Sequence, residues 1–419
     1  MPESYLVKSP ISTCRRSMRA GRISRLLAGA AGLSLLAVGG LAQQAVPAPR
    51  LAWNHMLDED AVVSRRFLAV HGRRAVIQGY ASEGLEVWAY PFQILGNYRV
   101  AFRPAGASTA IEGSGILARV IFQPDAATRI YLGPNFIVRE KLFVPLDRAG
   151  AILTYSVQSG KPIEIEVRAT PVLNLMWPAA AGGQYIEWSS SLSAFVLAEP
   201  AGGFTAVAGS PDIAAHDNPD NRTAHGVAET GFGFTLHPAP SGVARVFVAL
   251  NPPQAGDPGL LFRELIRDGE TLEAEAAAHV RDVRNDLLQV ETPDDRVNRA
   301  IAVSEIALDQ AWVCNPDLGC GYVAGYGPSR AARRPLYEWF FAGDGLVAAD
   351  AAIGVGDLVH AQEELKFILR YRDKKTGMIW HELSQSASLI DWAGKFPYMF
   401  VGILRVHMQP YPLCAGSAR

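Results

Sequence analysis

A change in residue pattern near residue 257 constrains the fold of this chain more than any other feature. Before it, short segments alternate apolar and polar residues with a period of two, as in "GLEVWAYPF" (84–92) and "KPIEIEVRATP" (161–171). Turn-forming clusters separate these segments, which is typical of many short antiparallel strands. After it, "DPGLLFRELIRDGETLEAEAAAHVRDVRNDLLQ" is rich in Ala, Leu and charged residues, as in a helix. The pattern predicts an antiparallel β-sandwich over residues 50–255, followed by helices.

The helical part divides into a linker and a domain. Residues 256–290 form the predicted linker helix. We expect a second helix with Thr292 as its N-cap and Pro293 at its first position, because these residue types favour those places. Two further helices are expected over 346–355 and 358–371. Their connections are rich in Gly, Pro and aromatic residues, so the loops are expected to carry the chemistry.

The N-terminal segment has the pattern of an export signal. A mostly apolar stretch, 26–41, would span about 24 Å as a helix, which is short of the ~30 Å hydrocarbon core. Small residues then precede Gln43, so we expect residues 1–42 to be a cleaved signal peptide and the protein to be periplasmic or secreted. A retained membrane anchor is the alternative. The stretch follows a basic region formed by Arg15, Arg16, Arg19, Arg22 and Arg25.

Charge and cysteine usage exclude several kinds of partner. The formal net charge of −2 gives no electrostatic reason to expect nucleic acid.

Cys314 and Cys320 flank "NPDLG", a turn-forming segment, and either form a disulfide in an oxidising compartment or stay as two free thiols. No second Cys or His pair stands nearby at metal spacing, so we expect no zinc site and no other cofactor. After signal cleavage we expect no membrane association, and the sequence does not define an oligomeric state.

Three loops combine carboxylates with aromatic residues, as saccharide sites do. The first, residues 315–345, ends in "YEWFFAGDG" and contains Glu338, Trp339 and Asp344. Aromatic faces can cover the C–H surfaces of a sugar, while carboxylates accept from its hydroxyls and can do acid–base work on a glycosidic bond. The alternatives are structural: Asp344 as N-cap of a helix starting at Gly345, and the aromatic residues as core packing.

The second and third loops are "TGMIWHELSQS" (376–386) and "IDWAGKFPY" (390–398). His381 is placed to orient Glu382, although a lone His is also a common structural residue. Asp391 and Trp392 form the corresponding pair in the third loop, or a solvated loop. We expect Asp344 and Glu382 to be catalytic. The expected substrate-binding residues are Glu338, Trp339, His381, Asp391 and Trp392.

The order of these motifs resembles a known superfamily. "NPDLG", "GYVAGYG", "EWFFAGDG", "TGMIWHELSQS" and "IDWAGKFPY" look like glycoside hydrolases of the glycogen-debranching (amylo-α-1,6-glucosidase-like) and processing-α-glucosidase types, whose clan includes glucoamylase and the disaccharide phosphorylases. Upstream, "GLEVWAYPFQILGNYRVAFRP" resembles the β-sandwich of bacterial members. The resemblance covers residues from about 65 to 400. It implies a β-sandwich followed by an (α/α)6 barrel of six helical hairpins, an inverting mechanism and an oligo- or polysaccharide substrate. Gly343 stands where members carry Arg or Trp before the Asp, which leaves the role of Asp344 open.

The resemblance also implies that the barrel is incomplete. Residues 291–405 can supply only part of six hairpins, and residues 406–419 lose the motif character and form an aberrant tail. The second catalytic carboxylate of this class usually lies far downstream, so we expect an inactive fragment of an inverting α-glucosidase or debranching enzyme. A phosphorylase of the same architecture and a non-catalytic carbohydrate-binding remnant are the alternatives.

Overall fold

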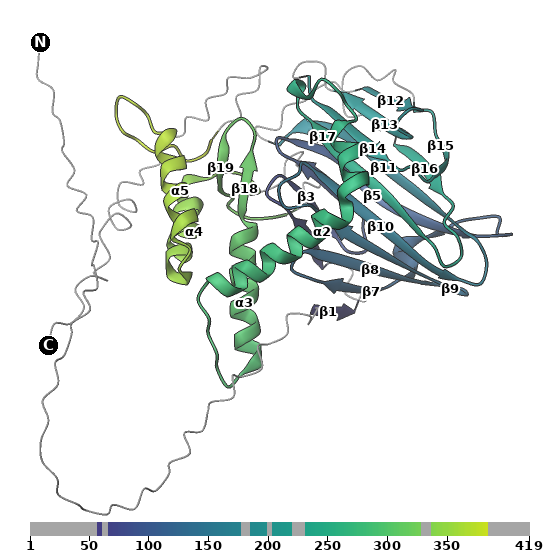
Figure 1. Cartoon of the computed structure of the whole chain (residues 1–419), viewed down its shortest axis with the longest axis horizontal. Coiled ribbons are helices and arrows are strands. Elements are labelled where there is room, and N and C mark those ends of the chain that lie inside the picture. The colour runs from purple at the N-terminus through teal and green to yellow at the C-terminus, as the bar shows by residue number, and fades with distance from the viewer. Residues whose placement is uncertain are drawn as a thin grey trace, which may run out of the picture. The chain divides into compact units, whose positions relative to one another are not determined.

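Two facing antiparallel sheets form the larger part of the molecule in the computed structural model (Figure 1). The structure describes residues 57–60 (backbone only), 66–176, 185–198, 203–219, 231–327 and 337–383. The nine-stranded sheet has the order β1 (Leu57–Asp60), β7 (Leu117–Phe122), β8 (Ala126–Gly133), β9 (Phe136–Phe143), β10 (Gly150–Ser159), β17 (Val243–Asn251), β14 (Thr205–Gly209), β13 (Ala194–Ala198), β12 (Tyr185–Ser189).

The eight-stranded sheet faces it across the core. Its order is β15 (Ile213–His216), β16 (Phe232–Leu236), β11 (Ile163–Leu175), β5 (Phe92–Pro104), β4 (Leu85–Ala89), β3 (Ala75–Tyr80), β2 (Phe67–His71), and β6 (Ile111–Glu112) pairs with β5. The short helix α1 (Gly113–Ile116) follows β6. In β11, Ile163, Ile165 and Val167 are buried, and the residues between them are partly exposed. The alternation predicted for this segment is therefore confirmed, because successive side chains of a strand point to opposite faces.

A long helix covers the outer face of the nine-stranded sheet. After the 3-10 turn η1 (Pro253–Ala255), α2 (Leu260–Asp286) packs Phe262 and Leu265 against Ile152 and Phe247 of the sheet. An ion pair between Lys141 and Glu273 (2.6 Å) adds to this contact. The helix predicted from the composition of this stretch is present, and its apolar side is what attaches it to the sandwich.

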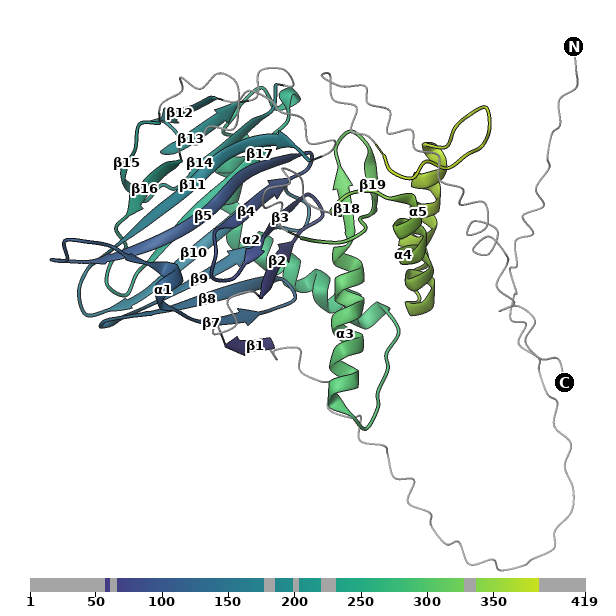
Figure 2. The same ribbon diagram turned by 180° about the vertical axis from the view of Figure 1, so that it is seen from behind.

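The described residues after α2 contain three more helices and a hairpin. These are α3 (Asp295–Gln310), β18 (Trp312–Asn315), β19 (Gly319–Tyr322), α4 (Ala342–Val355) and α5 (Leu358–Arg370). Both views show α4 and α5 side by side (Figures 1 and 2). The described residues do not show an (α/α)6 barrel. Among them, no helix combines the length and the apolar character needed to cross a bilayer.

Two predicted helix starts are wrong. Asp294, not Thr292, is the N-cap of α3, and its carboxylate accepts from the backbone N–H of Arg296 at 2.9 Å. Thr292 instead donates from its hydroxyl to the side chain of Asn298. The fourth helix begins at Ala342, so Asp344 lies in its first turn and is not its N-cap.

The disulfide is present. Cys314 and Cys320 face each other across the β18–β19 hairpin and are bonded. The backbone N–H of Cys314 donates to the carbonyl of Arg73 in the sandwich at 2.6 Å. The hairpin is therefore closed on itself and joined to the β-sandwich.

Candidate functional site

The helical part packs against the outer side of β4. Leu85, Val87 and Ala89 point into the sandwich core, so Glu86 and Trp88 face the opposite way. Trp88 belongs to a second apolar cluster, which joins the sandwich to the helices. The cluster contains Val76, Trp88, Tyr90, Met176, Val313, Leu318, Val323, Trp339, Phe340, Phe341, Ala342, Leu346, Phe367, Ile368 and Ile379. The aromatic segment predicted to line a sugar pocket is thus part of this core.

Trp339 is completely buried. Its indole N–H donates to the carbonyl of Leu383 at 2.6 Å, and its ring packs 5.3 Å from the ring of Phe340. A ring that stacks on a sugar must expose one face. The structure therefore places Trp339 in the core and not on a cavity wall, which corrects its expected role in stacking.

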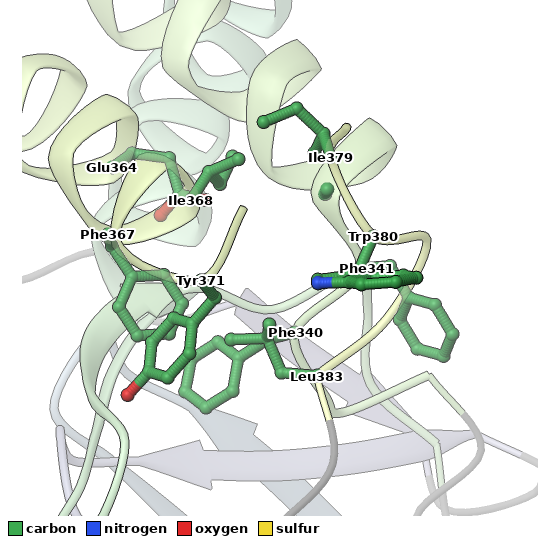
Figure 3. A pocket seen from close by; sticks show the side chains of 10 residues that line it. Phe340, Phe341, Glu364, Phe367, Ile368, Tyr371, Ile379, Trp380 and Leu383 are labelled. Carbon is green, nitrogen blue, oxygen red and sulfur yellow. The ribbon is translucent and has the colours of Figure 1, made fainter. Parts of the chain in front are cut away.

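Phe340 packs on the helices. Figure 3 shows its ring with those of Phe367 and Tyr371, while Trp380 lies beside Phe341. The Phe340 and Phe367 ring centroids are 4.9 Å apart. These rings line a small cavity, which Glu364 also lines (Figure 3). The carboxyl group of Glu364 accepts from the backbone N–H of Tyr322 at 2.7 Å. Burial raises the pKa of Glu364 to about 7.

Glu338 is buried as completely as the aromatic residues that follow it. The hydroxyl of Tyr90 donates to Glu338 Oε1 at 3.1 Å, and Oε2 has no hydrogen-bond partner among the described residues. Burial raises the pKa of Glu338 to about 8, against the opposing effect of the hydrogen bond from Tyr90. The side chain joins the sandwich to the helical part and lines none of the cavities described here, so the structure does not place it where a substrate could reach it.

The second loop lies alongside the first. Phe341 and Glu382 form an antiparallel bridge. On either side of it, the N–H of Ala342 donates to the carbonyl of His381 at 3.0 Å, and the N–H of Leu383 donates to the carbonyl of Phe340 at 3.2 Å. Two segments about 40 residues apart in the sequence are therefore paired by backbone hydrogen bonds. This pairing brings the neighbourhoods of Asp344 and Glu382 together.

A large cleft opens between α3 and α4. Its volume is ≈ 1030 Å³, and Asp344 and His381 both line it. Small and apolar residues of α3 and α4, such as Ala307 and Val347, form most of the wall. Asp344 is exposed in the first turn of α4, where the helix dipole stabilises a carboxylate.

Glu382 is not among the residues that line this cleft. Its neighbour His381 is, and successive residues of an extended segment point to opposite sides. His381 Nδ1 lies 3.9 Å from Glu382 Oε2. The structure therefore brings Asp344 and His381 to one cavity, with Glu382 behind them. Asp391 and Trp392 lie outside the described residues.

The sequence analysis missed Glu305. This residue lies on α3, lines the cleft and is 2% exposed. Arg284 of α2 donates to its Oε2, and its Oε1 is buried without a hydrogen-bond partner. The signal in the sequence was the helical spacing of Glu305 relative to Ala302 and Ile306, which puts this carboxylate on the same, buried face of the helix.

Tyr326 connects the cleft to the sandwich. Its ring lines the cleft, and its hydroxyl donates to the carbonyl of Gln310. On the other side it contacts the ring of His71 with 3.9 Å between centroids. Burial lowers the pKa of His71 to about 3, so this imidazole is neutral at ordinary pH. Among the described residues, no cluster of three or more His, Cys, Asp or Glu side chains is arranged to hold a metal ion.

Comparisons with known proteins identify the fold. No family model matches the sequence, and no curated protein does. A bacterial glucoamylase in complex with acarbose matches with a TM-score of 0.54 and 11% identity, over 82% of this chain and 56% of that one. A putative kojibiose phosphorylase from the human microbiome matches with a TM-score of 0.50 and 9% identity, over 73% of this chain and 46% of that one.

These comparisons show a glycosidase-type fold, of which the β-rich N-terminal region is the clearest part. The chain spans about half the length of the two solved structures.

Proposed function

We propose that this protein is carbohydrate-active and that the cleft between α3 and α4 is its saccharide site. The observation that carries the proposal is that Asp344 and His381, predicted from two separate motifs, line one cavity of ≈ 1030 Å³. The fold shared with a glucoamylase that binds acarbose supports the same substrate class. The finer proposal is a glycoside hydrolase of the inverting α-glucosidase or debranching type, acting on an oligo- or polysaccharide.

The roles in the cleft follow from exposure and charge. The Asp344 carboxylate is exposed and can accept from sugar hydroxyls or hold a proton for the leaving oxygen. The apolar wall suits the C–H faces of the sugar. Inversion also needs a second carboxylate that activates water. The sequence predicts Glu382 to be catalytic, but this residue does not line the cleft and so is not placed to activate that water. Glu305, which Arg284 holds in an ion pair, is a positioning residue.

We expect saccharide binding with turnover near background in this chain. Among the described residues that line the cleft, Asp344 is the carboxylate for which no ion pair is found. Removing a general base typically costs about 10²–10⁴ in rate. Among the described residues, the cleft wall therefore offers groups for binding and for an acid, without a second carboxylate placed to act as the base.

A phosphorylase is the second candidate. Its support is the fold shared with the putative kojibiose phosphorylase. In that reaction phosphate replaces the activated water, so turnover would depend on added phosphate. A non-catalytic carbohydrate-binding protein is the third candidate and would bind saccharide without any turnover.

Calorimetric titration of the full chain with maltooligosaccharides tests the site. Asp344→Asn should weaken binding at least about tenfold, as expected when an ionised hydrogen-bond acceptor is lost. The matched control is Asp295→Asn, which removes another exposed carboxylate from the first turn of a helix, α3. Equal affinities of both variants and the unaltered chain would refute the assignment of the cleft.

Activity assays separate the candidates. Maltooligosaccharides, trehalose and aryl α-glucosides are incubated with the chain with and without inorganic phosphate. Phosphate-dependent release of a sugar phosphate would identify a phosphorylase, and phosphate-independent release would identify a hydrolase. Robust turnover that survives Asp344→Asn would show that the acid lies elsewhere.

We also propose that the protein is exported, on the pattern of residues 1–42. These residues lie outside the described part of the chain. N-terminal sequencing of periplasmic or secreted material should find a first residue near Gln43. An intact N-terminus on membrane-bound protein would refute the proposal.

A further inference from the structure

A second cavity lies within the sandwich and shares no residue with the cleft. Its volume is ≈ 270 Å³, and the β3–β4 turn, β5, α1, β7 and β8 form its wall. Figure 2 shows α1 near β8, and the two elements are in contact. Arg129 and Tyr131 of β8 are among its buried residues, while Glu112 and Ser114 are exposed.

Arg129 has a buried nitrogen without a hydrogen-bond partner in the part of the chain that the structure describes. Its Nε donates to Glu140 Oε2 at 2.6 Å, and its Nη1 donates to the carbonyl of Ala81 at 3.3 Å. The third nitrogen, Nη2, is buried and has no hydrogen-bond partner, although the residue is only 3% exposed. A buried unsatisfied donor costs about 1–3 kcal/mol, and more when it is charged. A ligand oxygen at this nitrogen would supply the missing acceptor.

Buried hydrogen bonds around Glu140 fix the position of the Arg129 guanidinium. Glu140 is fully buried and accepts from the hydroxyls of Tyr131 at 2.7 Å and Tyr155 at 2.9 Å. Tyr155 is in turn 2.6 Å from the hydroxyl of Tyr98. These contacts leave Arg129 little freedom to turn toward another acceptor. Its unpaired nitrogen is therefore held in a fixed position in a residue that lines the cavity.

The residues that line the cavity are also tightly packed against one another at two glycines. A Cβ on Gly84 would lie 2.3 Å from Asn97 Oδ1, so only glycine permits this approach. Asn97 itself has a φ of 49°, in the left-handed region that Asn tolerates better than most residues. A Cβ on Gly113 would come within 3.1 Å of the Tyr131 ring. The two glycines keep the walls of the cavity close together.

The charges around the cavity balance. Arg99 and Arg129 line it together with Glu83 and Glu112, which gives two positive and two negative side chains. Glu140, behind the wall, already neutralises Arg129. A free anion would therefore gain little net attraction, whereas a neutral molecule with several hydroxyls could both donate to the glutamates and accept from the arginines. A volume near the lower end of the about 300–1,000 Å³ typical of drug-sized ligands suits one sugar ring.

We propose that this cavity binds a neutral polyhydroxylated molecule of monosaccharide size, with one ligand oxygen accepting from Arg129 Nη2. The inference is independent of the function proposed for the cleft. It gives the sandwich a binding site of its own, separate from the one between the helices.

Ligand-observed NMR on the full chain tests the proposal with D-glucose, D-galactose and D-mannose as probes. At least one of the three should give saturation transfer. Arg129→Lys keeps a positive charge beside Glu140 but removes the free nitrogen, and should weaken binding at least about tenfold. Because Arg129 is buried in an ion pair, this variant can fail to fold. Ser114→Phe adds a ring at an exposed residue that lines the cavity and should abolish the signal without changing the melting temperature.

The controls assign the signal to one cavity. Ser108→Phe adds the same ring at an exposed position that does not line the cavity, and should bind like the unaltered chain. All titrations are made in the Asp344→Asn background, which weakens the cleft site, so that the remaining signal reports the sandwich cavity. No saturation transfer from any of the three sugars would overturn the proposal. So would a signal that Ser114→Phe leaves intact in that background.

Discussion

Replacing Glu338 by Gln should remove a large part of the pH dependence of stability. The carboxyl group is fully buried, accepts from Tyr90 at 3.1 Å, and has a pKa that burial raises from its ordinary value of 4.5 to about 8. Below pH 4.5 the group is protonated in both the folded and the unfolded chain. As the pH rises toward 8, the unfolded chain loses this proton while the folded chain keeps it. Folding is therefore progressively disfavoured, and the loss is complete above about pH 8.

The size of the effect follows from the two pKa values. At 1.36 kcal/mol for each pKa unit, the full loss is on the order of 5 kcal/mol. Glutamine has the shape of the protonated acid and can still accept from Tyr90, but it cannot ionise. Glu338→Gln should therefore match the unaltered chain near pH 4.5 and exceed its stability by several kcal/mol above about pH 8.

Urea unfolding at a series of pH values, followed by tryptophan fluorescence, measures this difference. Trp88 and Trp339 are buried near Glu338 in the same cluster and should report its unfolding. Glu363→Gln is the control, because it removes an exposed carboxylate whose ion pair with Lys366 should contribute little. A stability difference between Glu338→Gln and the unaltered chain that stays constant with pH would refute the reasoning. So would a difference that grows as the pH falls.

Three further predictions concern the helical part. The pKa of Glu364 is raised to about 7, so stability from this group is lost as the pH rises from 4.5 through 7, and Glu364→Gln should flatten the urea-derived profile in that range. Replacing Cys314 and Cys320 by Ser should cost about 2 kcal/mol by the loop-entropy relation, and dithiothreitol should lower the melting temperature of the unaltered chain but not of this variant. Gly345→Ala should cost about 1–3 kcal/mol in chemical unfolding, because its Cβ would lie 2.2 Å from Glu364 Oε1. Gly354→Ala, with open space around its Cβ on the same helix, should be neutral or slightly stabilising, and equal losses at both glycines would contradict the packing argument.

Local pattern predicted a strand and pointed to two residues whose catalytic and binding roles stay predictions. The alternation in 161–171 identified a strand with one buried face, and the loop motifs identified Asp344 and His381, which do line one cleft. The aromatic residues were ambiguous in the sequence for a physical reason. The same ring can cover a sugar or fill a core, and only its partners decide between them. The partners of Trp339 are the buried residues of the cluster that contains Trp88 and Tyr90, so its ring fills a core.

By itself, the sequence determined the nature of each segment, because the hydrophobic period and turn chemistry act over a few neighbouring residues. It predicted the strands before residue 257, the helices after it and the loops that carry polar groups. Only the tertiary structure decided which of those groups face a cavity. Glu338 meets Tyr90 across 248 residues of sequence, and Arg129 is held by Glu140 from the next strand so that one nitrogen stays free. Burial and hydrogen bonding are set by partners that are distant in the chain, so no local pattern contains them.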